Sequence, residues 1–161
     1  MVTLPHLIVD GYNVIHAWPD LCREFHRGSD VVCDLLVEVV RVIHDAEGRH
    51  VTIVFDGKGE TMSLLHPTKE PSLTVIYTPS GTSADAIIEQ MASNAKGRQA
   101  VVVASRDNMI CETVSTVGGE SISPEALRDW VDRCQKQQTV TLLKQKQVSD
   151  KKFGAGLSEL F

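Results

Sequence analysis

The stretch LIVDGYNV, residues 7–14, decides how the rest of the chain is interpreted, because a short apolar run ends in Asp10 and a glycine. The same design returns in VTIVFDG, residues 51–57, where the run ends in Asp56. A third apolar run, AVVVA, ends three residues before Asp107. Continuous apolar runs are typical of parallel strands that are buried on both faces. Ligands of open α/β sheets bind beyond the carboxyl ends of such strands, so we expect the three acids to meet in one crevice.

Hydrophobic periodicity predicts strands that alternate with helices, and this order favours a parallel sheet with right-handed crossovers. We therefore predict a three-layer, Rossmann-like α/β fold with a four- or five-stranded, mainly parallel sheet. The predicted strands cover residues 6–10, 51–55, 73–77, 100–104 and 121–122. The predicted helices cover residues 30–47, 84–95, 108–117 and 124–134, with loops around Trp18-Pro19 and over 57–72.

The composition is that of a single globular domain, with 161 residues, 42% hydrophobic and 23% charged. No apolar stretch is long enough to span a membrane, and we expect no membrane partner. The apolar segment near the N-terminus lacks a basic lead, so we do not interpret it as a signal peptide. The four cysteines are widely spaced and form no CxxC pair. We interpret them as reduced thiols in a cytoplasmic protein.

Charge divides the chain into two parts. Residues 1–134 hold 11 basic and 19 acidic side chains, whereas residues 135–161 hold five basic and two acidic ones. An acidic body argues against nonspecific binding of polyanions over the whole surface. We expect residues 1–134 to form the domain and residues 135–161 to form a basic helix or arm that packs on the domain or on a partner. The tail is either a phosphate-binding segment or only a solvated one.

Each acid also has an ordinary structural explanation. Asp10-Gly11 and Asp56-Gly57 could be simple turn dipeptides, although both follow β-rich runs and neither precedes a hairpin partner. Asp107 could sit in the first turn of a helix and favour its dipole. A cluster is the alternative, because carboxylates that repel one another are usually relieved by a divalent cation.

The helix that starts near residue 84 adds further candidates. Asp85 follows Thr82 by three residues, close to a capping box, and capping is its better single explanation. Glu89 lies one turn later on the same face. A helix face that is only solvated does not need two acids pointing at a sheet edge. The turn that contains Thr82 and Ser83 precedes a helix N-terminus, where free amides can receive a phosphate. Asn13 follows Asp10 by three residues and could hold Asp10 or a metal-bound water.

Several other chemistries are excluded by the motifs. The chain has no GxxxxGK[ST] loop, no GxSxG elbow and no zinc-ligand spacing among its six histidines. Position 12, two residues after Asp10, is a tyrosine, whereas aspartyl-phosphate phosphatases carry a second aspartate there.

The sequence resembles the YacP-like branch of the NYN domain family, within the PIN-like ribonuclease superfamily. LIVDGYNVI at residues 7–15 is similar to the opening of that domain, and VFDG at 54–57 is similar to its second acidic motif. GTSAD at 81–85, with Ile88 and Glu89, is similar to the third motif, and VVASRD at 102–107 to the fourth. The match runs in order through most of residues 6–130.

The resemblance implies a PIN-like fold and a metal-dependent endoribonuclease that uses Mg²⁺ or Mn²⁺. Its partners would be RNA, messenger RNA in particular, and the ribosome. The acids it assigns to catalysis and metal binding are Asp10, Asp56, Asp85 and Asp107. An ungapped match to the family's Thr-Ser-Asp places Arg106 at the last acid, so Asp107 stands one residue later.

Two other functions remain open at this point. The chain could be a non-catalytic module that binds RNA or ribosomes, or it could be another metal-dependent phosphohydrolase. Whether the chain is the endoribonuclease or the non-catalytic RNA-binding module, we expect basic residues near the motifs and in the tail to contact phosphates. These residues are Lys58, Arg106, Lys144, Lys146, Lys151 and Lys152.

Overall fold

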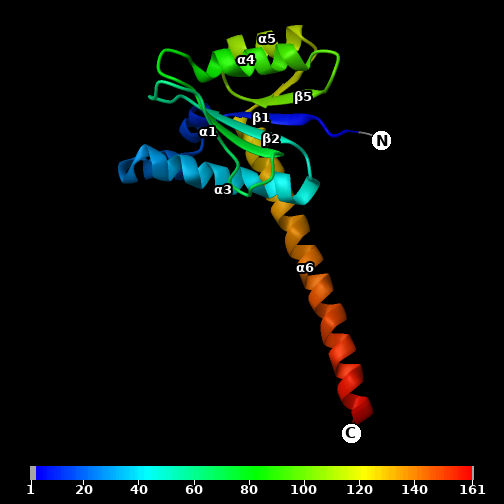
Figure 1. Ribbon diagram of the computed structural model, residues 1–161. Helices are drawn as coiled ribbons and strands as arrows, with labels where there is room; N and C mark the ends of the chain where they lie inside the picture. Colours follow the sequence, from blue (N-terminus) through cyan, green and yellow to red (C-terminus); the bar gives the residue numbers. More distant parts are fainter. Residues whose placement is uncertain (1–2, 161) are drawn as a thin grey trace.

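The structure is a computed structural model that describes residues 3–160, with side chains described through residue 148. Its centre is a six-stranded sheet in the order β3-β4-β2-β1-β5-β6 (Figure 1). The strands are β1 (His6–Asp10), β2 (Val51–Phe55), β3 (Ser63–Leu65), β4 (Leu73–Tyr77), β5 (Val101–Ala104) and β6 (Glu120–Ile122). The short edge strand β3 pairs antiparallel with β4, and all other pairs are parallel.

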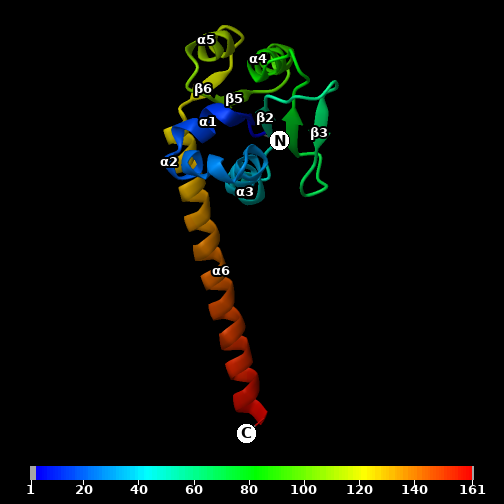
Figure 2. The same cartoon turned by 90° about the vertical axis from the view of Figure 1, so that its left-hand side faces the viewer.

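Helices cover both faces of the sheet and make three layers (Figures 1 and 2). One layer contains α1 (Gly11–Ala17), α2 (Pro19–Cys22), the 3₁₀ helix η1 (Arg23–Arg27), α3 (Ser29–Glu47) and the start of α6 (Pro124–Leu160). The other layer contains α4 (Ala84–Ala95) and α5 (Asn108–Thr116).

The central strand β1 explains this layering. Leu7 and Val9 point into the core beneath α1, α3 and α6, whereas Ile8 points into the core beneath α4 and α5. All three side chains are fully buried, as the continuous apolar run predicts for a parallel strand. The strand lies between β2 and β5, so Asp10 at its end emerges in the middle of the carboxyl edge.

The predicted fold class is confirmed, with one strand more than expected. β3 lies inside the predicted loop over 57–72, and its three residues are all exposed, so no burial pattern marks it in the sequence. The short helix α1 was also not predicted, because it starts with a glycine directly after a strand and spans only seven residues. Glycine is a poor helix former, and so short a helix depends on packing rather than on propensity.

The last helix differs most from the expectation. The sequence predicted an end near Cys134, but α6 continues without a break to Leu160 and projects away from the body (Figure 2). Leu127, Val131 and Cys134 bury its first turns, and the side chains of residues 139–148 are exposed. The side chains of Lys151 and Lys152 lie outside the described part of the chain. Within that part, no helix has the length and apolar character needed to cross a bilayer.

Candidate active site

Four carboxylates from four segments meet at the carboxyl edge of the sheet. Asp10 ends β1, Asp56 follows β2, Asp85 lies in the first turn of α4, and Asp107 follows β5. Burial raises the pKa of Asp10, and the charges of the three other acids raise it further. Burial also raises the pKa of Asp85, with added repulsion from Asp107 and Asp56. The four acids selected from the sequence therefore share one electrostatic site.

Asp10 is the buried member of this group, with 5% of its surface exposed. Its Oδ2 atom accepts a hydrogen bond of 2.8 Å from the Ser105 hydroxyl. This bond favours the charged form, yet burial dominates and raises the pKa of Asp10 to about 6. At neutral pH the protein therefore holds a buried negative charge. The Ser105 hydroxyl donates a hydrogen bond to it, and in the described part of the chain no cationic side chain pairs with it.

Asp56 connects β2 to the start of α4. Its Oδ1 atom accepts a hydrogen bond of 2.8 Å from the backbone N–H of Ala84, and the Ser83 hydroxyl caps the same helix by accepting from Ala86 at 3.2 Å. Ser83, and not the predicted pair of Thr82 and Asp85, thus fills the capping position.

The same contacts bear on the phosphate site predicted at Thr82 and Ser83. A helix N-terminus attracts an anion through its free amides and its dipole. Here the Asp56 carboxylate occupies that position, and Ser83 takes a further amide. The geometry therefore argues against a phosphate contact at Thr82 and Ser83, because a second anion would meet the negative charge of Asp56.

Three hydrogen bonds order the loop between β5 and α5: one joins it to β1, one joins it to α1, and one lies within the loop. Ser105 donates to Asp10, and the Ser105 hydroxyl oxygen also accepts from the backbone N–H of Asp107 at 3.1 Å. Asn13 Oδ1 accepts from the backbone N–H of Arg106 at 2.8 Å. Asn13 thus holds the loop that carries Asp107, rather than Asp10 itself. Ser105 was not among the residues predicted from the sequence, since its only signal is a hydroxyl directly after a buried apolar strand.

The fourth motif places its acid at Asp107. The Asp107 Oδ1 atom caps α5 by accepting from the backbone N–H groups of Met109 at 2.9 Å and Ile110 at 3.3 Å. The neighbouring side chain of Arg106 leaves the cluster and pairs with Glu125 on α6. The helix-start role and the cluster role of Asp107 are therefore compatible, since capping uses only one of its two oxygens.

Two further predicted residues flank the cluster. Glu89 lies one turn after Asp85, and its charge adds to the rise in the pKa of Asp85, after burial and the two nearer acids. Its Oε1 atom also accepts from the Thr113 hydroxyl at 3.4 Å, which ties α4 to α5. Lys58 lies in the loop that follows Asp56.

The donor set suits a hard divalent cation held partly through water. All four acids offer carboxylate oxygens, the ligands that Mg²⁺ and Mn²⁺ prefer. Asp10, Asp56 and Asp107 each use one oxygen for an internal hydrogen bond, and the other oxygen accepts none in the described part of the chain. In the described part of the chain, no group of three or more His, Cys, Asp or Glu side chains is arranged to hold a metal ion by itself. Mg²⁺ commonly binds through one or two carboxylates and keeps several waters, so the open arrangement fits it.

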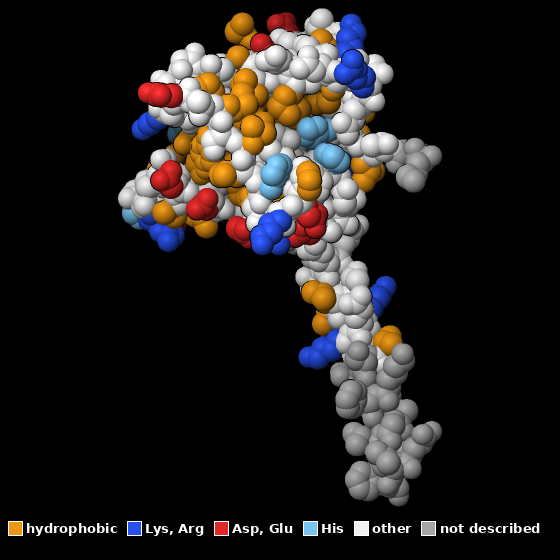
Figure 3. Space-filling view, viewed as in Figure 1, with side chains coloured by type: hydrophobic (Ala, Val, Ile, Leu, Met, Phe, Trp, Pro, Cys, Tyr) orange, Lys and Arg blue, Asp and Glu red, His pale blue; other side chains and the backbone are white. Residues whose placement is uncertain are grey.

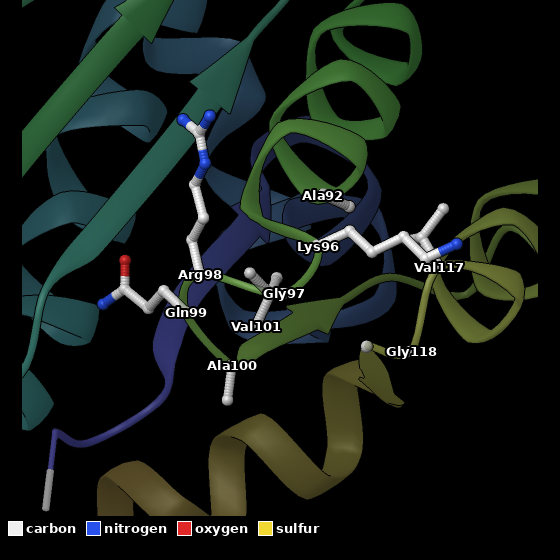
Figure 4. Close-up of a pocket in the computed structure, with 10 residues that line it drawn as sticks. Ala92, Lys96, Gly97, Arg98, Gln99, Ala100, Val101, Val117 and Gly118 are labelled. Atoms are coloured by element: carbon white, nitrogen blue, oxygen red, sulfur yellow. The ribbon is translucent and has the colours of Figure 1, made fainter.

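A separate cavity of about 510 Å³ lies at the opposite end of the sheet (Figure 4). It is bordered by the end of α4, the start of β5 and the turn at Gly118. Lys96 and Arg98 extend from its rim in different directions (Figure 4). Since β5 starts at Val101 and the acids lie beyond its other end, this cavity is not part of the carboxylate site.

Comparison with known proteins identifies the family and the fold. The model of the YacP-like NYN domain family matches residues 7–160. The uncharacterized protein YacP of Bacillus subtilis (strain 168) is 31% identical over 86 residues, which cover 53% of this chain and 50% of that protein. The chain thus aligns with only half the length of that curated relative.

Two crystal structures of Rae1 (YacP) from Bacillus subtilis share the fold. One superposes with a TM-score of 0.72 at 26% identity and covers 97% of this chain and 89% of that one. A mutant of the same protein gives a TM-score of 0.73 at 24% identity, covering 89% of this chain and 85% of that one. The chain belongs to the YacP-like NYN domain family, and its fold is that of a nuclease-type domain.

Proposed function

We propose that the protein is a metal-dependent endoribonuclease that hydrolyses RNA phosphodiesters at the carboxylate site. The observation that carries the proposal is the convergence of four acids from four segments on the nearly buried Asp10. A protein that only binds RNA has no need of a site that repels phosphate. A divalent cation would relieve the repulsion among the acids.

The residues of the site have different roles in metal binding and positioning. Asp10 is the central ligand of Mg²⁺ or Mn²⁺, and Asp56, Asp85 and Asp107 complete the site directly or through water. Ser105 orients the Asp10 carboxylate, and Asn13 holds the loop that presents Asp107. When bound, the metal lowers the pKa of the attacking water and neutralises charge that builds on the phosphate. Such hydrolysis leaves a 5′-phosphate on the product.

Messenger RNA and the ribosome are the partners proposed for this activity, in the cytoplasm. The body of the protein is acidic, so free RNA should bind weakly without metal. Lys58 beside Asp56, and Lys144 and Lys146 on the exposed part of α6, would supply phosphate contacts. Arg106 beside Asp107 would supply one by exchanging its Glu125 partner for a phosphate. A ribosome would add affinity that these few cations do not provide.

A second candidate is a non-catalytic module that binds RNA or ribosomes. It is favoured by the arrangement of the acids, since no group of three or more of them in the described part of the chain is placed to hold a metal ion by itself. The third candidate is a metal-dependent phosphohydrolase that acts on DNA or on nucleotides.

One assay separates the three. Purified protein is incubated with single-stranded RNA, single-stranded DNA and nucleotides in competition, with EDTA, Mg²⁺ or Mn²⁺, and product ends are mapped. The proposal predicts RNA products with 5′-phosphate ends only when metal is present. Cleavage of DNA or nucleotides in preference to RNA would support the phosphohydrolase, and RNA binding without any cleavage under Mn²⁺ would support the module.

A further inference from the structure

A row of aromatic rings lies beside the carboxylate site, on the α3 side of the sheet. Tyr12 stands two residues after Asp10 on α1, and its ring packs edge-on against Phe55 with centroids 5.3 Å apart. Phe55 in turn stacks on Tyr77 at 5.3 Å. Phe55 is the last residue of β2, Tyr77 is the last residue of β4, and Tyr12 lies in the first turn of α1. The row therefore follows the same carboxyl edge of the sheet as the acids.

The outer end of this row is a stack of three nearly parallel rings. Phe25 of η1 stacks on Tyr12 with centroids 6.4 Å apart and planes 21° apart. The ring of His16 stacks on Phe25 at 5.0 Å and 24°. Tyr12 and His16 are four residues apart on α1, so they present neighbouring rings to Phe25. We call His16 and Phe25 the outer rings.

His16 at the outer end of the row is exposed, whereas Phe55 at the inner end is anchored in the core. Phe55 is fully buried, and a Cβ on Gly11 would overlap its ring, so the backbone beside Asp10 packs directly on this anchor. Phe25 is half-buried and His16 is exposed. The row therefore presents accessible ring surface at its His16 end, where Phe25 supports His16 from within the stack, and it is anchored at Phe55.

Two basic residues lie in the same segment as Phe25, in a protein whose body is acidic. The η1 segment reads REFHR, so Arg23 and Arg27 flank Phe25, and both are at the surface. Arg27 pairs with Glu24 at 3.1 Å, but 54% of its side chain is exposed, and such surface pairs stabilise little. The left end of the molecule in Figure 3, where η1 lies in Figure 1, shows basic and acidic side chains next to one another.

We propose that the outer rings His16 and Phe25 form a stacking platform for the bases of single-stranded RNA, with Arg23 and Arg27 contacting the adjacent phosphates. The inference deepens the proposed function and rests on it, because RNA is the ligand. Sequence-specific and nonspecific RNA-binding proteins alike stack unpaired bases on aromatic side chains. Stacking gives affinity that does not depend on net positive charge, which this acidic body lacks.

The platform also explains how a strand is placed for cleavage. Tyr12, which contacts Phe25, belongs to the same β1–α1 junction as Asp10, so bases bound on the outer rings would lie on the side of the sheet edge from which the backbone can reach the carboxylates. The bases and the scissile phosphate are then held by neighbouring parts of one rigid unit.

The test measures RNA binding in a protein that leaves RNA intact. In the Asp10→Asn background, His16→Ala and Phe25→Leu are titrated with a short labelled single-stranded RNA by fluorescence anisotropy. Each change should weaken binding about tenfold, since one stacked base contributes on that order. His26→Ala is the matched control, because it removes an exposed ring from the same segment that does not belong to the stack. It should bind as the background does, and Phe25→Trp should retain binding.

An abasic RNA of the same length separates stacking from indirect effects. Stacking predicts that the abasic strand binds equally weakly to the background and to both variants. Equal losses for normal and abasic RNA, or no loss for either variant, would overturn the platform. The two proposals can fail separately. If wild-type protein does not cleave RNA but the variants still lose affinity for normal RNA and not for abasic RNA, the proposed reaction is refuted and the platform is supported. Intact cleavage without base-dependent losses would refute the platform alone.

Discussion

Replacing Asp10 by asparagine should stabilise the metal-free protein at neutral pH. Burial raises the pKa of Asp10 from its ordinary value of 3.8 to about 6. Between these two values the folded protein binds more protons than the unfolded chain does, so the free energy of unfolding falls as the pH rises from about 4 to about 6. Above that range the loss is complete, and the folded protein carries a buried charge that destabilises it.

The size of the effect follows from the shift. Each pKa unit corresponds to about 1.4 kcal/mol, so a shift of about two units costs roughly 3 kcal/mol at pH 7.5. Asparagine has nearly the same shape, and its amide oxygen can still accept from the Ser105 hydroxyl. For a chain of this length, the gain corresponds to a rise of roughly 6–12 °C in Tm. The prediction applies in EDTA, since a bound cation would stabilise the wild-type carboxylate.

Calorimetry or thermal unfolding in EDTA at several pH values measures the difference. The gain of Asp10→Asn over wild type should shrink towards zero by pH 4, where the folded wild type is protonated. Asp132→Asn removes the same charge from an exposed position on α6 and should change Tm little. If Asp10→Asn were no more stable than wild type at pH 7.5, or if its advantage persisted unchanged at pH 4, the description of Asp10 as a buried, charge-disfavouring site would be wrong.

Three further changes test other parts of the structure. Ser105→Ala removes a hydrogen bond that favours the charged form of Asp10, so the pH profile of cleavage should move to higher pH, and an unmoved profile would deny Ser105 its orienting role. Gly57→Ala should destabilise the fold by about 1–3 kcal/mol in urea unfolding, because its Cβ would overlap the Thr78 carbonyl oxygen. Gly59→Ala is its control, with the nearest atom 3.8 Å away, and equal stability of the two variants would contradict the close approach. Removing residues 144–161 should weaken RNA or ribosome binding across a salt series and leave metal binding intact; unchanged binding would show that the tail lysines are only solvated.

The sequence predicted the layers and the acids because both depend on local patterns. Buried parallel strands are continuous apolar runs, and an acid that follows such a run emerges at the carboxyl edge whatever the rest of the chain does. Asp10, Asp56 and Asp107 could therefore be placed together from these runs alone. Asp85 required the helix start to be found as well.

What the sequence did not reveal depends on contacts between distant residues. The hydrogen bonds from Ser105 to Asp10 and from Arg106 to Asn13 join residues more than 90 positions apart. The aromatic row has the same origin, because Phe25 meets Tyr12 and His16 only when η1 folds against α1.

Other elements were not predicted because their exposed residues carry no hydrophobic pattern. The edge strand β3 is one, since all its residues are exposed. A helix or an arm was expected over 135–161, but its unbroken continuation from the preceding helix was not, because the exposed part of α6 lacks the apolar stripe of a packed helix.

The central claim is that the carboxylate site hydrolyses RNA, and the most direct test compares single-turnover cleavage by wild type and Asp10→Asn in Mn²⁺. Asp132→Asn serves as the control for loss of a charge, and unfolding curves show that all three proteins are folded. We expect RNA cleavage by the wild type and the control, with 5′-phosphate products, and no cleavage by a folded Asp10→Asn. Cleavage by Asp10→Asn at the wild-type rate would contradict the claim.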